Sequence, residues 1–190
     1  MMTDRQLRRY FSALSLAAQA QSFISFVRQL RTQESLRTVG RTAAGSFPSA
    51  KMRRAIPCDS RGADSLWALA LESDPSVLEF YLEPPRTELY FSKPNEAQLD
   101  ALVAPYFFVL WLDGAGWADC LMEDFLTHVA RTNPGRYCHD GPGRWSCPIG
   151  EAFARPFGLS YRVLTQSMCR PDVLPNTGNL GQRDIGFVRS

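Results

Sequence analysis

Four cysteine and histidine residues in the C-terminal part of the chain could in principle hold a zinc ion. They are Cys138, His139, Cys147 and Cys169. Their spacing contains no Cys-x-x-Cys knuckle, so ordinary buried thiols are favoured over a zinc site. The chain has five cysteines, and an odd number favours free thiols over a disulfide framework.

Nucleophile and phosphate-binding motifs are missing from the sequence. His128 lies in a predicted helix, and His139 lies beside Asp140 in a glycine-rich loop. Neither histidine accompanies a Gly-x-Ser-x-Gly motif, and no glycine-rich phosphate-binding loop is present. Packing or surface roles are therefore favoured for both histidines.

The net charge of +2 hides an uneven distribution of charge along the chain. Residues 1–61 carry eleven basic and three acidic side chains. Residues 62–130 carry two basic and twelve acidic side chains, and residues 131–190 carry eight and four. Basic flanks around an acidic centre suit a protein that holds a polyanion with its flanks, although arginine-rich solvated faces are also common.

The N-terminal part of the chain has the pattern of one long amphipathic helix followed by a linker. Apolar residues recur at helical spacing over residues 4–33, within an N-terminal helical segment of residues 1–37. The apolar face must pack on something, either its own domain or a partner or second copy. Residues 38–57 predict a basic linker, because glycines and prolines alternate with arginine and lysine.

The remaining chain predicts an α/β domain over residues 58–167, with a central mixed β-sheet flanked by helices. Helices are predicted at 60–73, 122–131 and 148–155, strands at 77–82, 87–91, 104–112, 117–121 and 159–164, and a loop or short helix at 93–102. Residues 168–190 predict an irregular tail. No apolar run reaches the roughly 20 residues of a membrane span, and no signal peptide is visible, so we expect a cytoplasmic protein.

Five segments, in this order and spacing, resemble the N-terminal endonuclease domain of the TnsA family of transposition proteins. They are residues 48–54 (PSAKMRR), 58–61 (CDSR), 70–80 (ALESDPSVLEF), 143–151 (GRWSCPIGE) and 158–163 (GLSYRV). The resemblance covers about residues 40–165. It implies a restriction-endonuclease-like core that cuts the 5′ ends of an element by metal-assisted hydrolysis, beside an integrase-like transposase that handles the 3′ ends.

The resemblance also implies where a catalytic site would lie. In the family, a helix acid, an acid after proline and an acid-x-Lys pair hold Mg²⁺ and position the attacking water. These groups fall at Ala63, Tyr106, Asp119 and Leu121, so only Asp119 is kept. No lysine follows Lys93, and arginine is a poor substitute for a compact ammonium.

We therefore expect a catalytically inactive TnsA-like protein of a mobile element. It would act in DNA transposition by binding DNA ends or by bridging to a transposase. No cofactor is expected, since Asp119 alone would be a weak ligand for Mg²⁺. The residues expected to contact the DNA backbone are Arg41, Lys51, Arg53, Arg54 and Arg61.

Two alternatives stay open at the level of sequence. The first is an active, Mg²⁺- or Mn²⁺-dependent endonuclease with a rearranged site formed by Asp59, Asp64, Asp119 and Glu123. The second is a protein-interaction module without DNA binding, which would dimerise or bind a partner through residues 4–33 and the tail.

Overall fold

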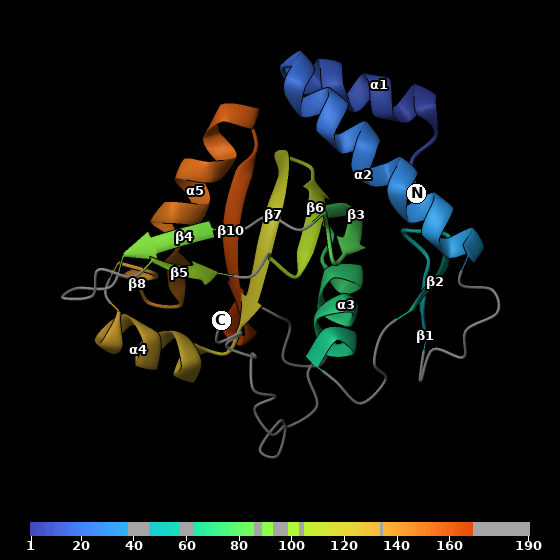
Figure 1. The fold of residues 1–190 in the computed structure, drawn as a ribbon. Helices are drawn as coiled ribbons and strands as arrows, with labels where there is room; N and C mark the ends of the chain where they lie inside the picture. Colours follow the sequence, from blue (N-terminus) through green and yellow to red (C-terminus); the bar gives the residue numbers. More distant parts are fainter. Residues whose placement is uncertain are drawn as a thin grey trace.

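The computed structural model describes residues 1–37, 46–57, 63–85, 89–92, 99–102, 105–133 and 135–168. They form an α/β fold around a four-stranded mixed sheet in the order β10-β7-β6-β3, with helices around it (Figure 1). The predicted α/β class and central mixed sheet are thus confirmed. None of the helices in these ranges has both the length and the apolar character needed to cross a membrane.

Three strands of the central sheet form an antiparallel meander, and the fourth is parallel to its neighbour. β3 (Val77–Leu82) pairs with β6 (Phe107–Trp111), and β6 pairs with β7 (Gly114–Leu121). β10 (Ser160–Thr165) then joins β7 in parallel. Every residue of β6 is buried, as its continuous apolar run predicted for a central strand.

Helices connect these strands in a simple order. α3 (Ala63–Ser73) precedes β3, while α4 (Glu123–Thr132) and α5 (Pro148–Ala154) lie between β7 and β10. α5 begins at a proline, whose missing N–H costs nothing in the first turn. Along the sheet the chain therefore runs helix, three antiparallel strands, helices and one parallel strand. The crossover through α4 and α5 is what allows β10 to lie parallel to β7.

One face of the central sheet is lined with aromatic rings. Directly paired residues share a face, which places Tyr161, Trp117, Phe108 and Tyr81 in one row across the four strands. Rings from two helices and a 3₁₀ turn (Arg155–Phe157) cover this row. Phe23 of α2 (Ala18–Arg37), Phe153 of α5 and Phe157 pack against Trp117 with centroid separations of 5.0, 5.0 and 5.7 Å.

The N-terminal segment contains two helices, so the prediction of a single long helix is wrong. α1 spans Asp4–Ala13 and α2 spans Ala18–Arg37. Between them Ser15 has a left-handed backbone (φ 50°), which a continuous helix does not allow. The apolar spacing continues through the break, so periodicity alone could not locate it. Leu7, Tyr10 and Phe11 of α1 and Ala20, Ile24 and Val27 of α2 are buried in the domain's own core.

Three further pairs of short strands surround the central sheet. β1 (Ser46–Ser49) and β2 (Arg54–Pro57) form an antiparallel hairpin inside the segment predicted as a linker. β5 (Leu99–Leu102) pairs with β4 (Leu89–Ser92), where a loop or short helix had been expected. β8 (Cys138–Gly141) and β9 (Arg144–Ser146) pair in the segment of His139 that had been predicted as a glycine-rich loop. These corrections share a cause, because short hairpins are stabilised mainly by what they pack on.

A buried ion pair joins α2 to the sheet. Glu79 of β3 is 0% exposed, and Arg28 donates to both of its carboxylate oxygens, with 2.6 Å between Nη1 and Oε1. The Tyr81 hydroxyl also donates to Glu79, and Arg28 Nη2 donates to the Met2 carbonyl at 2.8 Å. The pair therefore links β3, α2 and the segment leading into α1.

Breaking this pair from one side should destabilise the fold strongly. The Arg28→Met variant leaves a buried carboxylate without its cation, so we expect the free energy of unfolding to fall by about 3–5 kcal/mol. Urea denaturation followed by circular dichroism measures this loss. The double variant Arg28→Met/Glu79→Gln, which has no buried charge, should recover part of it. A loss below about 1 kcal/mol in the single variant would contradict a stabilising role for the pair.

Candidate functional site

The only predicted catalytic group that the chain keeps, Asp119, is a buried acceptor of two phenol hydrogen bonds. Asp119 lies on β7, two residues after Trp117, so its side chain is on the aromatic face of the sheet. It is 5% exposed. Its Oδ2 accepts hydrogen bonds from the Tyr161 hydroxyl at 2.7 Å and the Tyr137 hydroxyl at 3.0 Å.

Strand register and helix packing hold these phenols in place. Tyr161 of β10 pairs with Trp117, and Val163 pairs with Asp119, so Tyr161 and Asp119 lie diagonally across the parallel pair. A Cβ added at Gly150 of α5 would stand 2.6 Å from the Tyr161 ring, so α5 packs its backbone directly on that ring. Tyr137 lies just before β8 and is almost fully buried.

Burial sets the ionisation of the cluster. Burial raises the pKa of Asp119, and the hydrogen bonds from Tyr161 and Tyr137 and the charge of Arg136 oppose this rise. Burial, together with the nearby Asp119 charge, raises the pKa of both phenols, so they remain protonated donors. Burial also raises the pKa of the neighbouring Cys147 thiol to about 12, which makes it a poor nucleophile.

The cluster does not suit a divalent metal. Mg²⁺ needs several oxygen ligands in octahedral geometry, with carboxylates as its usual anchors. Two protonated hydroxyls already donate to one oxygen of Asp119. Within the part of the chain that the structure describes, no three His, Cys, Asp or Glu side chains gather as a metal site would require. The arrangement is instead that of a satisfied buried carboxyl group.

The structure brings three of the four predicted catalytic positions to one end of the β6–β7 pair. Tyr106 precedes Phe107, which pairs with Ala118, so Tyr106 lies opposite Asp119. Tyr106 is 37% exposed, and Leu121 is buried at the end of β7. The fourth position, Ala63, is the first residue of α3; only its backbone is described, as is the case for Asp64.

The other acids of the rearranged-site alternative do not join Asp119 in the described part of the chain. Glu123 begins α4, where its backbone N–H donates to Gln166 Oε1 at 2.9 Å. Its carboxylate accepts a hydrogen bond from the Ser167 hydroxyl. Asp59 lies outside the described residues. Glu123 thus joins α4 to the segment after β10.

One predicted DNA contact, Lys51, is committed to the protein itself. Its ammonium donates to the Leu71 carbonyl at 2.9 Å and to the Asp74 carbonyl, at the C-terminal end of α3. Burial lowers the pKa of Lys51. A cation at this end of a helix satisfies its free carbonyls and the helix dipole.

Glu72 completes the junction between α3 and the β1–β2 turn. Its carboxylate accepts from the Ser49 hydroxyl at 2.6 Å and from the backbone N–H groups of Ala50 and Lys51 at 2.9 and 3.0 Å. Two of the segments that carry the TnsA resemblance, 48–54 and 70–80, therefore bind each other. Sequence reasoning read them separately and missed this contact.

The other predicted DNA contacts have different surroundings. Arg53 is exposed in the β1–β2 turn with a left-handed backbone (φ 53°), whereas Arg54 is half-buried in β2. Arg41 and Arg61 lie outside the described residues. Arg53 is therefore the predicted contact that the structure shows open to solvent.

The zinc alternative also finds no support among the described residues. Cys147 is buried, and the His139 ring packs on Trp145 with a centroid separation of 4.9 Å. Cys169 lies outside the described residues. Tyr137 and Tyr161, which sequence reasoning missed, are the actual partners of the candidate acid. The strand predicted over 159–164 contains Tyr161, but its register against β7 is not readable from sequence.

Comparison with models of known protein families gives no match, and comparison with curated proteins gives none. Function is therefore inferred from the residues and their geometry. The centre of that geometry is a buried carboxyl group that is hydrogen-bonded by two phenols, next to a thiol that is itself buried. It lacks both the ligands of a metal site and an activated nucleophile.

The contact between Gly150 and Tyr161 should be intolerant of even one added methyl group. Gly150→Ala forces the ring or α5 to move, and overpacking of this kind costs about 1–3 kcal/mol. That loss should outweigh the gain of up to about 1 kcal/mol that alanine brings in a helix. Thermal or urea unfolding measures the change. Gly114→Ala is the matched control, since nothing lies within 4 Å of its added Cβ; equal effects would contradict the packing argument.

The pH dependence of stability should report the environment of Asp119. Its pKa is higher in the folded chain than the ordinary value of 3.8, so the folded state binds the proton more tightly. This proton stabilises the folded chain fully at a pH below the pKa that Asp119 has in the unfolded chain. The stabilisation is lost as the pH rises through the higher pKa that Asp119 has in the folded chain. Asp119→Asn keeps an oxygen for the phenols but does not ionise. Relative to the wild type, it should gain stability as the pH rises from about 4 to about 8.

Urea unfolding at both pH values measures this difference. The control is Asp140→Asn, which removes an exposed carboxylate on β8 and should show a much smaller pH-dependent difference. A relative stability of Asp119→Asn that stays constant or falls with pH would contradict the assignment.

Proposed function

We propose that this chain is a TnsA-like protein that does not cut DNA, and that it acts in DNA transposition by binding DNA ends or bridging to a transposase. The observation that carries the proposal is the position and state of Asp119. It lies on β7, where the resemblance places the acid of the acid-x-Lys pair, yet two phenols occupy its Oδ2. The proposed location is the cytoplasm.

The order of elements supports the endonuclease-like part of the proposal. α3, β3, β6, β7, α4 and β10 follow one another along the chain, and the sheet order is β10-β7-β6-β3 (Figure 1). A restriction-endonuclease-like core requires a helix, an antiparallel meander, a crossover helix and a parallel strand. The acid and the lysine of the family site would project from the β6–β7 pair, the pair that contains Asp119 and Leu121.

The chemistry of the site supports the loss of cutting. Burial raises the pKa of Asp119, which disfavours the charged form that a metal needs. Leu121 stands on β7 where the resemblance expects lysine, so no ammonium is available there to position a water. No described observation favours the rearranged active site. For the interaction-module alternative, Leu7, Tyr10 and Phe11 of α1 and Ala20, Ile24 and Val27 of α2 are already used in the domain's own core, whereas Phe26 of α2 is exposed.

Charge supports the DNA-binding part. Loss of the family's other carboxylates removes negative charge that would repel phosphate. Arg53 is open to solvent, while Arg41 and Arg61 stay predictions. The net charge of +2 is small, so binding would depend on where the basic side chains gather rather than on the total.

Cleavage and binding can be tested with one protein preparation. We expect no nicking of supercoiled plasmid above the level of the Asp119→Asn control at any Mg²⁺ or Mn²⁺ concentration. We also expect gel-shift binding of duplex DNA that weakens steeply with salt, because phosphate contacts release counterions. Metal-dependent nicking that disappears in Asp119→Asn would overturn the non-cutting assignment. Absence of binding at low salt would overturn the DNA-binding assignment.

The role in transposition has its own test. We expect the gene to lie beside one for an integrase-like transposase, an ATPase regulator or an intact nuclease, and the purified protein to bind that partner. A gene neighbourhood without any of these would contradict the role in transposition while leaving DNA binding open to the gel shift.

A further inference from the structure

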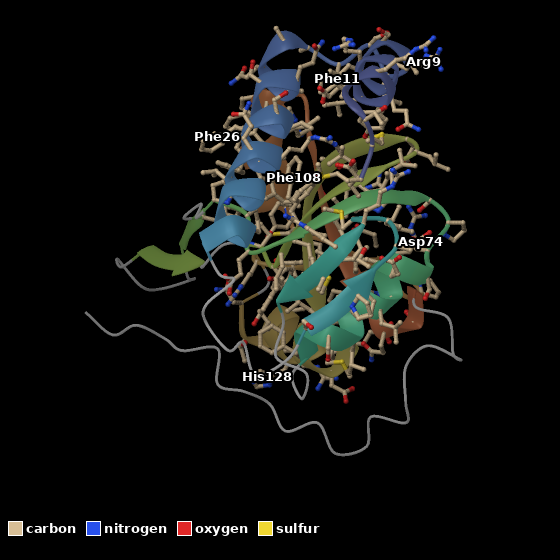
Figure 2. The ribbon with its side chains drawn as sticks, turned by 90° about the vertical axis from the view of Figure 1, so that its right-hand side faces the viewer. Arg9, Phe11, Phe26, Asp74, Phe108 and His128 are labelled. Atoms are coloured by element: carbon tan, nitrogen blue, oxygen red, sulfur yellow. The ribbon has the colours of Figure 1, made fainter. Side chains whose placement is uncertain are left out.

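The outer face of α1 carries a set of exposed arginines. Arg5, Arg8 and Arg9 are exposed, and the opposite face buries Leu7, Tyr10 and Phe11. Figure 2 shows Arg9 pointing away from the body of the protein, while Phe11 lies on the side of α1 that faces α2. The helix is therefore divided into a basic outer face and an apolar inner face.

Helix α1, which carries these arginines, is held in place at both ends. The Thr3 side chain and Gln6 form a capping box that fixes the start of α1. The Tyr10 hydroxyl donates to the Gly114 carbonyl at 2.6 Å, which attaches the helix to the start of β7. Arg5 and Arg9 are about one helical turn apart, so they present two charges about 6 Å apart along the axis.

Among the described residues, no acidic side chain forms an ion pair with the three arginines. Within the described part of the chain none of them takes part in an ion pair, whereas Arg28 and Arg162 pair with Glu79 and Asp113. Asp4 lies in the first turn of α1, where it suits the positive end of the helix dipole. The outer face thus keeps a local excess of positive charge directed at solvent.

The segment before α1 lies against the β1–β2 turn. The Met1 nitrogen donates to the Lys51 carbonyl, and Arg53 is exposed in the same turn. We call the exposed basic side of α1, formed by Arg5, Arg8 and Arg9, the α1 face.

We propose that the α1 face binds the phosphate backbone of double-stranded DNA. This rests on the proposed function, because it names the surface by which the protein would hold DNA. α1 is anchored to Gly114 at the start of β7. Gly114 lies five residues before Asp119 on the same strand, which corresponds to about 17 Å for the rise per residue of a β-strand. The DNA would then lie at the opposite end of β7 from the former cutting site, which agrees with binding without cleavage.

The inner face of α1 favours a nucleic acid over a membrane as the partner. A helix that binds a lipid surface must insert its apolar side into the lipid. Here that side is buried in the protein core, so only charge remains for the partner. Exposed guanidinium groups on a helix whose apolar side is buried match a polyphosphate backbone.

The test compares two pairs of substitutions that remove the same charge from different surfaces. Arg5→Gln/Arg9→Gln removes two charges from the α1 face. Arg131→Gln/Arg144→Gln removes two exposed charges from α4 and β9, at the other end of the molecule (Figure 1). Affinity for a duplex of random sequence is measured by fluorescence anisotropy across a salt series, and circular dichroism verifies folding.

We expect the slope of log affinity against log salt to shrink by about 1.8 in Arg5→Gln/Arg9→Gln, about 0.9 for each lost phosphate contact. The control pair should change it far less. If the wild type binds DNA and the two pairs have equal effects, or Arg5→Gln/Arg9→Gln has none, the α1 face is overturned while DNA binding stands. If the wild type binds no DNA, both proposals fail. Binding to phosphatidylserine vesicles but not to DNA would overturn the choice of partner.

Discussion

The buried pair between Glu79 and Arg28 is the constraint on which the arrangement of the chain depends. A fully buried carboxylate, such as that of Glu79 on the edge strand β3, is tolerated only when a cation and hydrogen-bond donors satisfy it. Arg28 can reach Glu79 only if α2 crosses that part of the sheet, and Arg28 also contacts the Met2 carbonyl. One interaction thus fixes α2 over β3 and brings the segment before α1 to its place, which sets the position of the α1 face.

The buried carboxylates of Glu79 and Asp119 have different direct partners. Arg28 lies directly on Glu79 and forms a salt bridge with it. Asp119 has neutral phenols as its direct partners, with the charge of Arg136 as a weaker influence, and burial raises its pKa. The first carboxylate serves as an anion in a structural pair. The second has surroundings that raise its pKa, and the described residues place no group of three metal-binding side chains around it.

Two of the segments that carry the TnsA resemblance, 48–54 and 70–80, contact each other and so have a structural role. Lys51 and Glu72 come from two of these segments, and they join the β1–β2 turn to the end of α3. Lys51 donates to carbonyl groups at the end of α3, so its ammonium is not free to bind phosphate. The basic residues of segment 48–54 therefore indicated more charge available to DNA than the structure provides. Resemblance in such a segment can reflect the need to hold a helix end as much as the need to bind DNA.

Much of the central domain was determined by the sequence alone. The continuous apolar run of β6, the proline at the start of α5 and the alternation in β10 each indicate a local structure that the tertiary fold does not override. The break at Ser15 and the β1–β2 hairpin were not predictable, because they depend on packing against distant segments. The contacts of Asp119 were likewise decided only by the tertiary structure: the register of β10 on β7 places Tyr161, and the fold of the segment before β8 places Tyr137. The sequence identifies Asp119 as the candidate acid, but its burial, and so its chemistry, follows from neighbours far away in the chain.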